Sequence, residues 1–103
     1  MEIKINVFSK INFFKITANT NSGQFVCNGK NVNINVNDFA QKLLSIVAFW
    51  DENLTLPNVQ DAESYLITII KDGQKLNLTG QGQYPQGYSE FINLLKEVSA
   101  CLA

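Results

Sequence analysis

The residues on either side of Asp72-Gly73 constrain this fold more than any other feature of the sequence. Residues 65–71 and 74–79 are rich in β-branched and aliphatic side chains, and Asp-Gly between two such runs is typical of a two-residue hairpin turn. A two-residue turn sets the pairing, so Ile67 should lie opposite Leu78 on the apolar face. The sequence therefore predicts a tight antiparallel hairpin here.

Asn28-Gly29 predicts a second hairpin of the same kind, between residues 24–27 and residues 30–36. This dipeptide tolerates the two positive φ angles that a type I′ turn requires. Counting outward from the turn places Phe25 opposite Val32 on the core side, while the alternating asparagines of the second run face water.

The N-terminal part of the chain predicts two further strands. Residues 2–8 alternate between apolar and polar side chains, which is the period of a half-buried strand. Residues 11–18 place apolar groups on both faces, because Phe13 and Phe14 are consecutive in the sequence and point to opposite faces of a strand. This second strand is therefore predicted to be more central than the first.

Two stretches have the apolar spacing of helices. The first is predicted to be capped by Asn37 or Asp38 and to be mostly buried, because its apolar arc is wide. That arc consists of Phe39, Ala40, Leu43, Leu44, Ile46, Val47, Ala48, Phe49 and Trp50. The second helix should begin near Ser89, and its main stripe is Phe91, Leu95, Val98 and Leu102. Residues 51–61 have no periodicity and contain Pro57, so they are predicted to form a long connection.

Together these elements predict an α+β fold with a mainly antiparallel six-stranded sheet, in the order ββββαββα, and two helices packed on one face. An alternative arrangement splits the sheet so that the helices are sandwiched or lie at one end. The length fits a single domain over residues 1–103. Residues 28–34 and 72–78 share the order turn, Gly, apolar, Asn, apolar, which fits either a duplication or the common needs of a hairpin followed by a helix.

The polar composition excludes several classes of site. The chain contains neither His nor Arg, which removes Ser-His-Asp and Cys-His catalysis, the HExxH zinc site, and bidentate contacts to phosphate or guanine. Cys27 and Cys101 are too few for a disulfide framework or a metal centre. We therefore expect a protein that is not an enzyme and that uses no metal and no cofactor.

Lysines and phenylalanines near the N-terminus resemble the basic, aromatic surfaces that bind single-stranded nucleic acid. These residues are Lys4, Lys10, Lys15, Phe8, Phe13 and Phe14. The net charge is −1, and a sheet edge guarded by lysine explains the same residues. We expect no nucleic-acid partner.

No apolar run approaches the roughly 18 residues of a membrane span, so the expectation is a soluble, cytoplasmic protein without a membrane partner.

The Gly/Gln/Tyr loop at residues 80–88 is the first candidate site. Its Gly-x-Gly lacks the further glycine, the lysine and the βαβ setting of a phosphate loop. Tyr84, Pro85 and Tyr88 instead suit a protein contact, because tyrosine offers a large and stiff amphipathic ring. The alternative is structural: a tyrosine covers the edge of the core and Pro85 ends the strand.

Trp50 with Asp51 and Glu52 is the second candidate site. An aromatic anchor beside carboxylates suits a basic protein partner, whereas the structural alternative is a core tryptophan at a helix end.

From these features we expect a small bacterial protein-binding domain, of the inhibitor or immunity-like kind. The alternative function is a small-ligand-binding or homo-oligomeric accessory protein that uses the uncovered sheet face.

Overall fold

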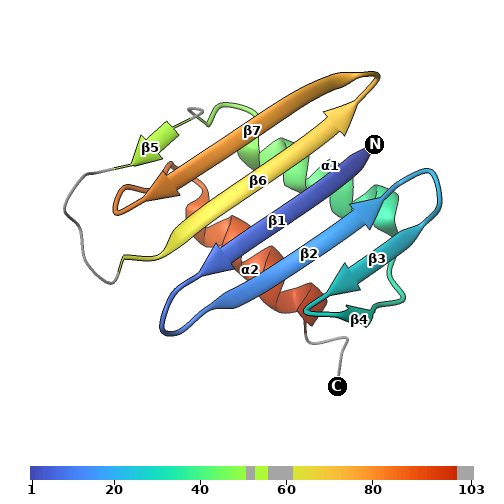
Figure 1. Cartoon of the computed structure of the whole chain (residues 1–103), viewed down its shortest axis with the longest axis horizontal. Coiled ribbons are helices and arrows are strands. Elements are labelled where there is room, and N and C mark those ends of the chain that lie inside the picture. Colours follow the sequence, from blue (N-terminus) through green and yellow to red (C-terminus); the bar gives the residue numbers. More distant parts are fainter. Residues whose placement is uncertain (51–52, 56–61, 100–103) are drawn as a thin grey trace.

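The computed structural model describes residues 1–50, 53–55 and 62–99. Figure 1 shows one sheet with two helices behind it. The elements in chain order are β1 (Glu2–Phe8), β2 (Phe13–Asn19), β3 (Gln24–Cys27), β4 (Lys30–Asn31), α1 (Val36–Val47), β5 (Asn53–Thr55), β6 (Ser64–Lys71), β7 (Gln74–Gln81) and α2 (Tyr88–Ser99). Across the sheet the strands are ordered β4-β3-β2-β1-β6-β7-β5.

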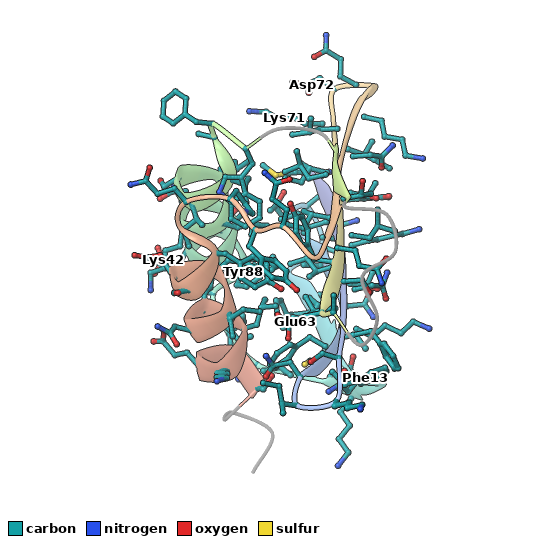
Figure 2. The ribbon with its side chains drawn as sticks, turned by 90° about the vertical axis from the view of Figure 1, so that its left-hand side faces the viewer. Phe13, Lys42, Glu63, Lys71, Asp72 and Tyr88 are labelled. Carbon is teal, nitrogen blue, oxygen red and sulfur yellow. The ribbon has the colours of Figure 1, made fainter. Side chains whose placement is uncertain are left out.

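The predicted α+β architecture is confirmed. All six predicted strands are present and pair antiparallel with their neighbours, and both helices cover the same face of the sheet (Figures 1 and 2). Within the described residues the sheet has a seventh strand, β5, which pairs parallel with β7. This strand lies inside the stretch that was predicted to be a connection. The prediction missed it because a strand of three residues is too short to show a periodicity in its side chains.

In both hairpins the strands pair as their two-residue turns predict. Ile67 pairs with Leu78 across β6 and β7, and the Val32 amide donates to the Phe25 carbonyl at 2.8 Å beyond the short strand β4. At each turn the two central residues have positive φ, including 52° at both Asn28 and Asp72. The turn dipeptides therefore set the register locally.

The prediction that the second strand is the more central one is wrong. The middle strand of the sheet is β1, and β2 lies one position away from it. Phe14 points into the core, but Phe13 is 57% exposed on the uncovered face. The apolar residues on both faces of β2 therefore do not indicate a strand that is covered on both sides, because Phe13 on the uncovered face is exposed to solvent.

The first helix begins earlier than predicted. α1 starts at Val36, and its N-cap is Asn35, whose side-chain oxygen accepts from the Asp38 amide at 3.0 Å. The predicted caps, Asn37 and Asp38, therefore lie inside the first turn. There the Asp38 carboxylate is favoured by the partial positive charge of the helix end. Since β4 ends at Asn31, the predicted strand was also too long.

The core fills the space between the sheet and the helices. Its fully buried side chains come from five strands and both helices, and the largest are Phe25, Phe91, Ile3, Ile5, Ile16, Leu43, Ile67, Leu78 and Leu95. The apolar arc of α1 is narrower than predicted, because Ala48 is exposed and Phe49 is 97% exposed. Phe49 thus lies outside the core, just past the end of the helix.

Candidate functional site

Aromatic side chains from four segments meet at one end of the sheet, where β7 leads into α2. The centroid of the Trp50 ring lies 5.6 Å from that of Tyr65, 6.1 Å from Tyr88 and 5.4 Å from Phe91. Tyr84 joins the group by packing against Tyr88 at 4.7 Å. Edge-to-face and tilted contacts of this kind add to the free energy gained from burial.

A hydrogen bond joins the end of the first helix to the loop before the second helix. The indole N–H of Trp50 donates to the carbonyl of Gln86 at 2.9 Å, across 36 residues of sequence. Gly87 follows with φ of 92°, a backbone conformation that favours glycine. This turn lets α2 begin at Tyr88, directly against Trp50.

Gly80 makes room for Tyr65 within the sheet. The two residues are directly paired across β6 and β7. A β-carbon on Gly80 would lie only 2.6 Å from Cζ and from the hydroxyl oxygen of Tyr65. The Tyr65 ring therefore covers the glycine backbone on the core face of the sheet, as aromatic side chains do at other strand glycines.

Glu63, just before β6, is the polar centre of this end of the molecule. One carboxylate oxygen accepts from the Ser9 hydroxyl at 2.9 Å and from the Asn12 side-chain amide at 2.7 Å. The other accepts from the Tyr88 hydroxyl, and the Glu63 backbone carbonyl accepts from the Tyr84 hydroxyl at 2.8 Å. Figure 2 shows Tyr88 between the helices and the sheet, close to Glu63.

The environment of Tyr88 holds its hydroxyl in the neutral form. Burial raises the pKa of Tyr88 well above its usual value, and the hydrogen bond to Glu63 and the negative charge of that carboxylate raise the pKa further. Tyr88 is therefore a hydrogen-bond donor at neutral pH.

A surface groove of about 500 Å³ opens beside this cluster, and we call it the loop groove. It is lined by Ile46, Phe49, Trp50, Gln83, Tyr84, Pro85 and Gln86. Two of its aromatic side chains are exposed, Phe49 by 97% and Tyr84 by 40%. Among the described residues none of the lining side chains is charged, so this part of the groove presents aromatic rings and neutral amides.

The predicted site residues divide into two groups. Trp50, Tyr84 and Pro85, drawn from two separate predictions, line the same groove. Tyr88 is half-buried beneath it and packs on both Trp50 and Tyr84. Trp50 itself is only 9% exposed, so the structural alternative describes Trp50 and Tyr88 well.

Two of the predicted residues, Asp51 and Glu52, lie outside the described residues. The sequence interpretation also missed two participants. Phe49 has a weak signal, because neighbouring side chains on a helix point about 100° apart and Trp50 next to it already fits the apolar spacing of the helix. Glu63 carries no such signal, because its partners Ser9 and Asn12 are more than 50 residues away along the chain.

Among the described residues, no group of three or more His, Cys, Asp or Glu side chains is placed to hold a metal ion. In the same part of the chain, neither helix has the length and apolar character needed to cross a membrane. Comparisons with protein-family models, with curated proteins and with solved structures found no match.

Proposed function

We propose that this chain is a non-enzymatic protein-binding domain that contacts its partner through the loop groove. The observation that carries the proposal is the meeting of Phe49, Trp50 and Tyr84 in one groove, from segments more than 30 residues apart. Residues that dominate binding energy in protein interfaces are enriched in tryptophan and tyrosine. A groove of this composition is therefore suited to a polypeptide partner.

The groove is held in shape before any partner arrives. Trp50 is fixed by its hydrogen bond to Gln86, and Tyr84 by its hydrogen bond to the Glu63 carbonyl. Rings that are already ordered lose little conformational entropy on binding. Gln83 and Gln86 add exposed amides that can donate to the backbone carbonyls of a partner.

Phe49 is the expected anchor of the contact. Its side chain is 97% exposed beside the groove, and a large exposed apolar side chain gains free energy when a partner covers it.

The small size of the chain and the lack of His support an inhibitor or immunity-like role in a bacterial cytoplasm over an enzymatic one.

A photo-crosslinking amino acid at position 49 tests this proposal in the source cell. We expect it to capture one partner protein, while the same amino acid at position 75, on the uncovered sheet face, does not. With the partner in hand, Phe49→Ala and Tyr84→Ala should each weaken the affinity about 30-fold or more, as hot-spot substitutions do.

Lys75→Ala is the matched control, because Lys75 is also exposed but lies away from the groove. Its affinity for the partner should equal that of the wild-type protein. A captured partner whose affinity is unaffected by both groove substitutions would refute the assignment of the groove.

A further inference from the structure

The connection between β1 and β2 exposes three large apolar side chains to solvent. Phe8 is 65% exposed, Ile11 is 88% exposed and Phe13 is 57% exposed. Phe8 and Phe13 face each other across the two strands, with ring centroids 6.2 Å apart in an edge-to-face contact. We call residues 8–13 the hairpin tip. Exposed apolar clusters of this kind mark protein or membrane contacts.

Hydrogen bonds within the hairpin tip and to Glu63 define its conformation, so the exposure of its apolar side chains is part of the fold. The Ser9 amide donates to the Asn12 carbonyl at 2.8 Å. The Ser9 hydroxyl accepts from the amides of Ile11 and Asn12, at 3.2 Å and 2.9 Å. Glu63 then anchors Ser9 and Asn12 to the body of the domain. These bonds fix the turn that carries the exposed side chain of Ile11.

Among the described residues, two lysines and one carboxylate lie at or beside the hairpin tip: Lys10, Lys15 and Glu63, whose carboxylate accepts from Ser9 and Asn12. Lys10 is exposed within the tip, and Lys15 is exposed on the same sheet face as Phe13, two residues further along β2. Over the uncovered face as a whole, the charged strand residues are Glu2, Lys4, Lys15 and Lys75. The outer sides of the two helices instead carry Asp38, Lys42, Glu90, Lys96 and Glu97. The strand residues of the uncovered face thus comprise three lysines and one carboxylate, whereas the two helices carry two lysines and three carboxylates.

We propose that the hairpin tip binds the surface of an anionic lipid membrane. Its apolar side chains enter the boundary between headgroups and acyl chains, and the lysines stay at the level of the headgroups. Figure 2 shows Phe13 on the side of the sheet away from the helices, so that the helices would point into water.

The shape and charge of the tip favour a lipid surface over a protein partner. Phe8, Ile11 and Phe13 project from the domain, and a bilayer can accommodate projecting side chains without a preformed pocket. The two lysines add attraction to anionic headgroups that falls with salt. The expectation of no membrane partner rests on the lack of a spanning segment, and this lack has no bearing on contact with a membrane surface.

Vesicle flotation with the full chain tests this inference. We expect the wild-type protein to bind vesicles of phosphatidylcholine mixed equally with phosphatidylglycerol, and to bind phosphatidylcholine alone at least about fivefold more weakly, since each lysine near the surface contributes attraction of that size. Ile11→Ser should lower the bound fraction on the mixed vesicles about tenfold, because it removes the most exposed apolar side chain from insertion. Lys15→Gln should lower it about fivefold.

Phe49→Ser is the matched control, since it removes an even more exposed apolar side chain from the loop groove. It should leave vesicle binding unchanged, and Ile11→Ser should leave binding of a groove partner unchanged, so the two proposals fail separately. Each of three results would overturn the lipid assignment: equal binding to both vesicle types, full binding by Ile11→Ser, or a dimer in solution that Ile11→Ser dissociates. Capture of a protein by a photo-crosslinker at position 11, with no vesicle binding, would also overturn it.

Discussion

The Glu63 carboxylate accepts hydrogen bonds from the hairpin tip and from Tyr88 of α2. The energetic coupling between Glu63 and Tyr88 measures how strongly this carboxylate stabilises the end of the sheet. The perturbations are Glu63→Gln, Tyr88→Phe and the double variant. Glutamine keeps the shape of the side chain but removes its charge. Phenylalanine keeps the ring contacts of Tyr88 with Trp50 and Phe91 but removes its hydroxyl.

The expected magnitudes follow from the bonds that each change removes. A hydrogen bond to a charged group contributes about 1.5–3 kcal/mol, and a neutral one about 0.5–1.5 kcal/mol. Since Glu63 and Tyr88 are both partly exposed, the lower ends of these ranges apply. We expect each single substitution to lower the free energy of unfolding by about 1–2 kcal/mol. The double variant should lose about 1 kcal/mol less than the sum of the two, because Glu63→Gln removes the charge from the shared bond and Tyr88→Phe removes its donor.

Urea unfolding followed by tryptophan fluorescence provides the assay. Trp50 is the only tryptophan of the chain and packs directly on Tyr88, so its emission reports on this end of the domain. Linear extrapolation gives the free energy of each variant when the transition is two-state. Glu2→Gln is the control, because Glu2 is an exposed carboxylate on β1. A coupling energy below about 0.3 kcal/mol would mean that the two sites are independent and would refute the reasoning.

Three further predictions concern stability. Above pH 10.0, the usual pKa of tyrosine, Tyr88 loses its proton in the unfolded state but keeps it in the folded state. The free energy of unfolding should therefore fall as the pH rises. Urea midpoints measured across this pH range should fall less for Tyr88→Phe than for the wild-type protein. Gly80→Ala should cost about 1–3 kcal/mol by forcing the Tyr65 ring aside, and an unchanged melting temperature would contradict the close packing seen between them. Asn35→Ala should cost about 1 kcal/mol through loss of the cap on the Asp38 amide, whereas Asn37→Ala, which removes no cap, should cost clearly less in the same thermal unfolding experiment.

The local parts of this fold could be predicted from the sequence because their causes are local. Asn28-Gly29 and Asp72-Gly73 adopt positive φ within two residues, and the pairing of the flanking strands follows by counting. The alternation of residues 2–8 marks one buried face for the same reason, since successive side chains of a strand point to opposite faces. The six predicted strands, the two turns and the two helices therefore needed no knowledge of distant contacts.

The tertiary structure decided which of these elements lie side by side. The central place of β1 depends on its pairing with both β2 and β6, and the parallel partner of β7 is a strand of only three residues. Trp50 and Tyr84 look like separate candidates in the sequence, but they share a groove because α1 ends where the loop into α2 passes. Glu63 connects segments that only the strand order brings together. Such contacts arise from long-range packing, and a periodicity of two or of 3.6 residues carries no information about it.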